Sequence, residues 1–141
     1  MGILTLEDTI YANIPPSKAR RRAGALMATL AILFLLVDAM GKVLRLAPYV
    51  QGTTELGYPE TAVLTIGIIE LACLAVYVAP PTSVLGAILL TGYLGGAVAT
   101  HVRLGSPLFT HTLFPVYVAL LVWGGLYFRE QRLPALIPLR R

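Results

Sequence analysis

Residues 61–79 read TAVLTIGIIELACLAVYVA, an apolar run with one charged residue, Glu70, at its middle. Such a run is long enough to cross a lipid bilayer as an α-helix, which places its centre near the bilayer midplane. A carboxyl group at that depth costs roughly 2.5–3.5 kcal/mol on insertion scales. Membrane proteins usually give such a group a partner, a proton or a function. We therefore predict either a functional role or an essential structural pairing for Glu70.

Three other apolar stretches extend this interpretation to the whole chain, at residues 23–37, 83–100 and 109–128. Hydrophobic residues make up 57% of the 141 residues and charged residues 13%, whereas soluble domains carry about 25% charged residues. We predict an all-α protein that folds as a four-helix transmembrane bundle. Its membrane domain is expected at residues 22–128, after a cytoplasmic segment at 1–21 and before a basic cytoplasmic tail at 129–141.

Basic residues lie mainly at the two ends of the chain and predict its orientation. The first stretch follows Lys18, Arg20, Arg21 and Arg22, and the last precedes Arg129, Arg132, Arg140 and Arg141. The connection at residues 80–82 has no charge, and the other two connections share Lys42, Arg45 and Arg103. The positive-inside rule favours both termini in the cytoplasm, in what we expect to be a bacterial inner membrane. The net charge of +4 then follows from this rule and from anionic lipid, so no nucleic acid partner is expected.

This topology brings polar residues from distant parts of the sequence to the outer end of the bundle, above Glu70. They are Asp38, Lys42, Arg45, His101, Arg103 and His111. We expect a ligand site in this outward half of the bundle. The residues expected to bind the ligand are Asp38, Lys42, Glu70, Tyr93, His101 and Arg103. Asp38 precedes Lys42 by one helical turn, with the acid first, which is the favourable order for a helical ion pair.

Each of these residues except Glu70 has an equally plain structural interpretation. Asp38 and Lys42 could simply pair with each other at a helix end, and Arg103 could extend to lipid phosphate. His111 is expected on the surface. His101 could make a structural hydrogen bond or handle protons. The cost of burying a carboxyl group makes Glu70 the residue with the strongest indication of function.

Several chemistries have no support in the sequence. The single cysteine, Cys73, excludes an internal disulfide and is expected to pack as a small core residue. No metal-ligand spacing is present, and the two histidines are too few for a pair of bis-histidine haems, although their number permits a single haem. Gly92 and Gly96 form a small-xxx-small pair. We expect this pair to pack against a helix of the same bundle, with a second copy as the alternative.

Three stretches resemble the DoxX-like family of small four-helix membrane proteins. They are DAMGKVL at residues 38–44, IGIIEL at 66–71 and GYLGGAVATHVRLGSP at 92–107. The resemblance covers about residues 22–128 and implies a four-helix membrane fold. It also marks Lys42, Glu70, His101 and Arg103 as shared residues. The chain departs from the family pattern at Asp38, which stands where a small residue is usual, and at Gly41, which directly precedes Lys42.

The resemblance implies a redox-associated role or a role in membrane-protein assembly. Our first hypothesis is a small redox-associated subunit that binds a quinone or another lipophilic molecule in the outward half of the bundle. Glu70 and His101 would exchange protons, while Lys42 and Arg103 would stabilise negative charge on the ligand. The alternative is a non-catalytic assembly or scaffold protein that binds another membrane protein or a second copy. Whether the protein is an enzyme stays open, since no redox centre is recognisable in the sequence.

Overall fold

The computed structural model describes residues 17–129 and residue 133, and this part of the chain is helical, with no strand. The long helices are α2 (Lys18–Val43), α4 (Glu60–Val78), α5 (Ser83–Arg103) and α6 (Phe114–Arg129). Shorter elements connect them: α3 (Ala47–Glu55), the 3₁₀ turn η1 (Pro80–Thr82) and the π-helical turn η2 (Leu108–Thr112). Within the described residues, four helical segments are long and apolar enough to cross a membrane. The prediction of an all-α, four-helix transmembrane bundle is confirmed.

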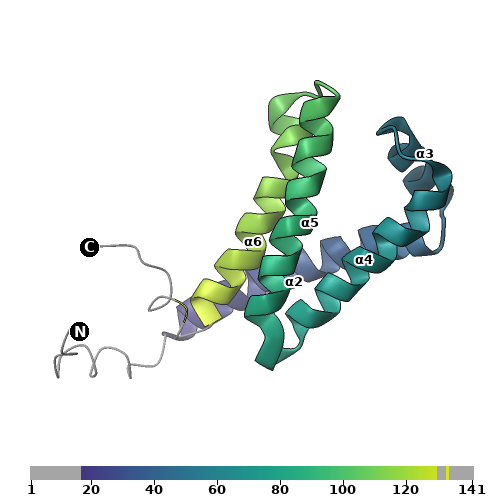
Figure 1. Cartoon of the computed structure of the whole chain (residues 1–141). Helices are drawn as coiled ribbons and strands as arrows, with labels where there is room; N and C mark the ends of the chain where they lie inside the picture. Colours follow the sequence, from purple (N-terminus) through teal and green to yellow (C-terminus); the bar gives the residue numbers. More distant parts are fainter. Residues whose placement is uncertain (1–16, 130–132, 134–141) are drawn as a thin grey trace, which may run out of the picture.

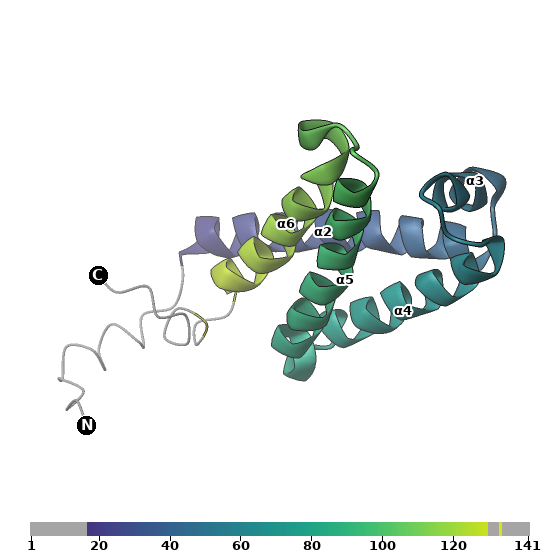
Figure 2. The same ribbon diagram turned by 45° about the horizontal axis from the view of Figure 1, so that its top comes forward.

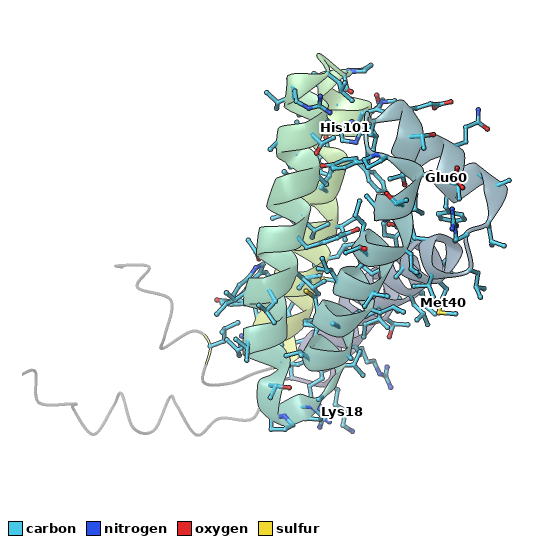
Figure 3. The ribbon with its side chains drawn as sticks, turned by 45° about the vertical axis from the view of Figure 1, so that its right-hand side comes forward. Lys18, Met40, Glu60 and His101 are labelled. Carbon is cyan, nitrogen blue, oxygen red and sulfur yellow. The ribbon has the colours of Figure 1, made fainter. Side chains whose placement is uncertain are left out.

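The long helices form two pairs that meet at one end and diverge at the other (Figures 1 and 2). Helix α2 packs against α4 and α6, and α5 packs against α4 and α6, so each helix has two neighbours. The pairs meet near η1, which joins α4 to α5, and we call this the closed end. They separate toward α3 and η2, which we call the open end. His101 and Glu60 lie away from Lys18, which begins α2 (Figure 3).

Helix α2 begins close to the place where α6 ends. Arg20 Nη2 in α2 donates a hydrogen bond to the backbone oxygen of Tyr127 in α6, at 3.2 Å. The Arg20 guanidinium also lies over the Tyr127 ring, 5.4 Å from its centroid. Most of the expected cytoplasmic segments, residues 1–21 and 129–141, lie outside the described residues, although α2 already begins at Lys18. The described ends of α2 and α6 therefore share one side of the bundle.

Glycine residues fix how closely the helices approach one another. A Cβ atom added to Gly86 would lie 2.2 Å from the Tyr77 backbone, so α4 and α5 cross at this point. In contrast, a Cβ added to Gly92 or Gly96 would have no heavy atom within 4 Å. The expectation that Gly92 and Gly96 pack against a helix of the same bundle is therefore wrong. The close contact of α5 lies at the closed end, before the two pairs diverge.

The connection between α2 and α4 is more ordered than the sequence indicated. Helix α2 continues through Asp38 and Lys42 to Val43, past the apolar stretch that ended at residue 37. After a turn in which Arg45 has a positive φ of 52°, the chain forms α3, with Pro48 in its first turn. A Cβ added to Gly41 would lie 2.4 Å from the Tyr49 ring. Glycine at position 41 thus allows α3 to fold against the end of α2.

The core lies between the long helices and is densest at the closed end. Leu35, Leu90 and Val122 are fully buried, and Cys73 packs among them as a small core residue, as expected. Tyr77 is 1% exposed, and its hydroxyl donates to the backbone oxygen of Val122 at 3.0 Å. Many large apolar side chains face outward instead, among them Leu26, Leu33 and Ile68. Such outward-facing apolar residues are expected of helices that contact lipid.

Candidate functional site

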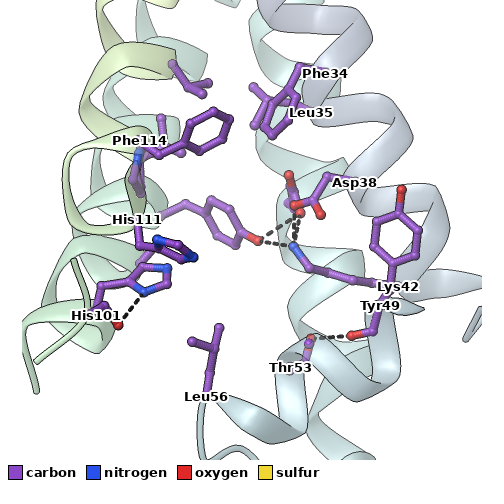
Figure 4. A pocket seen from close by; sticks show the side chains of 18 of the residues that line it. Phe34, Leu35, Asp38, Lys42, Tyr49, Thr53, Leu56, His101, His111 and Phe114 are labelled. Atoms are coloured by element: carbon purple, nitrogen blue, oxygen red, sulfur yellow. Dashed lines mark hydrogen bonds and ion pairs between the residues drawn. The ribbon is translucent and has the colours of Figure 1, made fainter. Parts of the chain in front are cut away.

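A group of four polar side chains joins three helices at the level where the bundle begins to open. Lys42 Nζ in α2 donates to Asp38 Oδ2, to Glu70 Oε2 at 2.9 Å and to the Tyr93 hydroxyl at 3.0 Å. The Tyr93 hydroxyl in α5 donates in turn to Glu70 Oε2 in α4, at 2.8 Å. Figure 4 shows these contacts as dashed lines. We call Asp38, Lys42, Glu70 and Tyr93 the Lys42 cluster.

Helix spacing and one glycine place these side chains together. Asp38 and Lys42 are one turn apart on α2, so the predicted ion pair between them is confirmed. Gly67 lies about one turn before Glu70 on the same face of α4. A Cβ added to Gly67 would lie 2.8 Å from Lys42 Cβ and 3.1 Å from the Ala39 carbonyl oxygen. The missing side chain lets α2 approach α4 closely enough for Lys42 to reach Glu70.

Because the Lys42 cluster is largely buried, its stability depends on the hydrogen bonds between its members. The Glu70 side chain is 0% exposed, that of Lys42 13% and that of Asp38 29%. Removing an ion from water costs several kcal/mol unless its partners are well placed. An ammonium group carries three N–H donors, and Lys42 directs them to Asp38, Glu70 and Tyr93. Lys42 therefore pairs with both carboxylates and has no N–H left for another partner.

One oxygen of the cluster is left without a hydrogen bond. Glu70 Oε1 is buried, and no donor among the described residues reaches it. An unsatisfied buried polar group costs about 1–3 kcal/mol, and more when it is charged. Two carboxylates also face a single ammonium, so the cluster has one acidic group more than it has basic groups. An unsatisfied buried group of this kind needs an explanation, so Glu70 is the main candidate for a functional residue in the cluster.

The Lys42 cluster lies in the wall of a cavity of about 530 Å³ between the two helix pairs. Apolar side chains form much of the remaining wall, including Phe34, Leu35, Phe114 and Val118. A smaller cavity of about 330 Å³ opens between α4 and α5 and is lined by Ile69, Gly92 and Gly96. Six residues line both cavities: Lys42, Thr53, Leu56, Tyr93, Ala97 and His101. A concavity of this size that combines apolar walls with convergent polar side chains is typical of small-molecule sites.

Two histidines lie across the large cavity from Asp38 and Lys42 (Figure 4). The rings of His101 and His111 meet edge to face, with centroids 5.9 Å apart. His101 Nδ1 is 3.1 Å from Ser106 Oγ, so this histidine makes a structural hydrogen bond and lines the cavity as well. His111 is exposed, as expected. No hydrogen bond joins His101 to the Lys42 cluster within the described part of the chain.

The two arginines expected at the outer end lie apart from this cavity. Arg103 Nη2 donates to the backbone oxygen of Leu56 at 2.7 Å, and its guanidinium lies against Gly57. Arg45 pairs with Glu60 on the surface. Neither arginine is among the residues that line the two cavities. The polar residues of the outer end therefore fall into three groups. One is the buried Lys42 cluster, the second is the pair of histidines, and the third is the two arginines, which bind the segments next to α3.

Helix α3 supplies cavity residues that the sequence did not indicate. Tyr49, Thr53 and Leu56 line the large cavity, and the Thr53 hydroxyl donates to the Tyr49 backbone oxygen at 2.8 Å. Phe34 and Phe114 were also unexpected there, and their rings meet edge to face with centroids 5.1 Å apart. Pro48 is the one sequence signal that could have indicated α3, because proline favours the first turn of a helix.

Comparisons with known proteins give one result. Neither the curated proteins nor the solved structures contain a match to this chain. A family model, described as the DoxX-like family, matches residues 26–125. The match includes all four residues of the Lys42 cluster as well as His101 and Arg103. The chain is therefore an integral membrane protein of the DoxX-like family.

Proposed function

We propose that this DoxX-like protein binds a lipophilic molecule of the quinone class in the large cavity and serves as a small redox-associated membrane subunit. One observation carries the proposal: a buried, partly unsatisfied charged cluster lies in the wall of a largely apolar cavity of about 530 Å³ inside a membrane bundle. Structural packing alone would favour apolar residues at this depth. A cavity of this size matches the range of small-molecule sites.

The walls of the cavity suit a molecule that enters from the bilayer. Phe34 on α2 and Phe114 at the start of α6 line the cavity, and both are exposed to the surroundings of the bundle. A ligand with an apolar tail and a polar ring would leave the tail between these helices. Its ring would lie against the Lys42 cluster on one wall and His101 on the other.

Glu70 and His101 are the groups that we assign to proton exchange. A quinone takes up two electrons and two protons to become a quinol, and the electrons would come from a partner redox protein. Glu70 and His101 line the same cavity, and Glu70 contacts Lys42, which lies across from His101. Each could hold or release a proton at one end of the ring. Lys42 holds the carboxylates in place, because its N–H groups are already used. Arg103 donates its hydrogen bond to the connection after α3, at the Leu56 backbone oxygen.

The orientation is part of the same proposal. Basic residues at both ends of the chain favour cytoplasmic termini in a bacterial inner membrane, and the open end would then face outward. Reporter fusions after Arg141 and within residues 52–57 test this. Opposite sides are expected, with the first fusion cytoplasmic. If both fusions report the same side, the cavity cannot belong to the outward half.

Assembly of another membrane protein is the second candidate, and one observation favours it. Gly92 and Gly96 form an exposed strip on α5 that no helix within residues 17–129 covers. Such strips allow a helix of another protein or a second copy to approach closely. In this function the Lys42 cluster would fix one packing arrangement of the bundle rather than contact a ligand.

Mass spectrometry of a lipid extract from the purified protein tests the first function against the second. A quinone or related molecule in stoichiometric amount is expected. Ala97→Phe should remove it by filling the cavities, because Ala97 lines both. Ala99→Phe, two residues along the same helix and exposed, is the matched control and should retain the molecule. An extract with no enriched lipophilic molecule, together with one recurring protein partner, would support the assembly function instead.

A further inference from the structure

We propose that the large cavity recognises a hydroxyl group, and so binds a quinol or phenol in preference to the quinone. This inference rests on the proposed function and specifies the chemical form of its ligand. The carboxylate oxygens of Asp38 and Glu70 would accept the hydrogen bond from the ligand hydroxyl.

The donors of the Lys42 cluster are already occupied. Lys42 directs its N–H groups to Asp38, Glu70 and Tyr93, and a lysine has three such donors. The Tyr93 hydroxyl has one proton, which it donates to Glu70 Oε2. A quinone carbonyl is only an acceptor, so the Lys42 cluster offers it no partner.

The acceptors of the same cluster are in surplus. Glu70 Oε1 has no hydrogen-bond partner among the described residues. Asp38 accepts the hydrogen bond from Lys42 through Oδ2 alone. Asp38 lines the cavity, and its side chain is 29% exposed. Two carboxylates against one ammonium also give this wall a negative charge when both are ionised, which favours the positive end of an O–H dipole. The wall therefore complements a donor.

The remaining polar groups of the cavity do not reverse this preference at the Lys42 cluster. The Thr53 hydroxyl donates to the Tyr49 backbone oxygen, and Ser106 Oγ is within hydrogen-bond distance of His101 Nδ1. The two histidines lie across the cavity from Asp38 and Lys42 (Figure 4). They would contact the far side of a bound ring, so a hydroxyl that points to the near side would meet the carboxylates of the Lys42 cluster.

A pair of redox-inactive probes tests the inference with the unmodified protein in detergent. The pair is a 4-alkylphenol and its methyl ether with the same tail, because the ether keeps the shape and loses the donor. Hydrogen bonds to charged groups predict that the phenol binds at least about tenfold more tightly in equilibrium dialysis. The quinone with the same tail should resemble the ether. Equal affinities for phenol and ether would overturn the inference and leave the proposed function standing. Failure of every probe to bind would overturn the proposed function itself.

Glu70→Gln provides the second arm. Lys42 and Tyr93 donate to residue 70, so the glutamine oxygen must take their side and its NH₂ group must take the position of Oε1. The wall then gains a donor, and the preference for the phenol should vanish or reverse. Asp38→Asn likewise replaces a carboxylate by an amide. It serves as the test if circular dichroism shows that Glu70→Gln does not fold. Glu60→Gln is the control, because Glu60 is exposed outside the cavity. An unchanged preference for the phenol in both cluster variants would contradict the inference.

Discussion

The closed and open ends of the bundle use similar residues for different purposes. At the closed end, the Tyr77 hydroxyl is satisfied by the Val122 backbone oxygen, and Gly86 brings α5 against the Tyr77 backbone. At the open end, the Tyr93 hydroxyl contacts Lys42 and Glu70, and Gly96 faces open space. One end thus pairs its tyrosine hydroxyl with backbone and closes, whereas the other pairs its tyrosine hydroxyl with ionised side chains around a cavity. The difference indicates that close packing and backbone hydrogen bonds hold the closed end together, whereas a charged cluster beside a cavity holds the open end.

The largest effect should follow from removing the cation of the open end. Lys42→Met leaves Asp38 and Glu70 facing each other without neutralisation, and breaking a buried ion pair in this way costs about 3–5 kcal/mol. Combining it with Glu70→Gln should recover part of that loss, because one unpaired charge disappears. Chemical unfolding in mixed micelles measures both. If the losses of the two single variants simply add in the double variant, the charges are independent and the open end is solvated.

A glycine exchange at each end should give the next largest contrast. Gly86→Val places side-chain atoms where a Cβ would already lie 2.2 Å from the Tyr77 backbone, and such overpacking should cost about 3 kcal/mol or more. Gly96→Val should change the free energy of unfolding by less than about 0.5 kcal/mol, since nothing lies within 4 Å of its added Cβ. A large loss for Gly96→Val in monomeric micelles would show that α5 packs tightly at both ends.

Tyr77, which is buried, and Tyr93, which is partly buried, allow a matched comparison of hydroxyl groups. Tyr93→Phe removes hydrogen bonds to two charged groups and should cost about 1.5–3 kcal/mol. Tyr77→Phe removes one hydrogen bond to a backbone oxygen and should cost about 1 kcal/mol. Only Tyr93→Phe should also alter binding of the phenol probe. Equal losses and equal binding would mean that the hydroxyl of Tyr93 has no role beyond that of Tyr77.

Arg103 should give the smallest effect. Arg103→Met removes an exposed hydrogen bond to the Leu56 backbone oxygen, which should cost less than about 1 kcal/mol. Binding of the phenol probe should be unchanged, because Arg103 does not line the cavities. A loss of binding as large as that of Glu70→Gln would place Arg103 back in the ligand site.

Hydropathy predicted the number of spans, helical spacing predicted the Asp38–Lys42 pair, and the cost of buried charge singled out Glu70, which is fully buried. They could not predict which face of a helix packs inward, because apolar residues face lipid as readily as the core. Gly92 and Gly96 show this: their spacing indicated a close contact, but the helix pairs have already diverged at that level. Helix α3 was missed because its 9 residues are too few for a clear periodic pattern. Arg103 was expected near the ligand because the position of a residue in a span indicates its depth in the membrane. It does not indicate the direction in which the side chain points.

The ion pair between Lys42 and Glu70 has a consequence for how the chain enters the membrane. Its two members belong to α2 and α4, and α2 is synthesised first. Lys42 is therefore already available when the segment with Glu70 leaves the ribosome, and the two spans can move into lipid as one hairpin. A rearranged gene that encodes α4 before α2 is expected to insert less efficiently, and a glycosylation-site assay of insertion would measure the difference. Synthesis of α2 before α4 thereby provides the cation before the carboxylate that it pairs with.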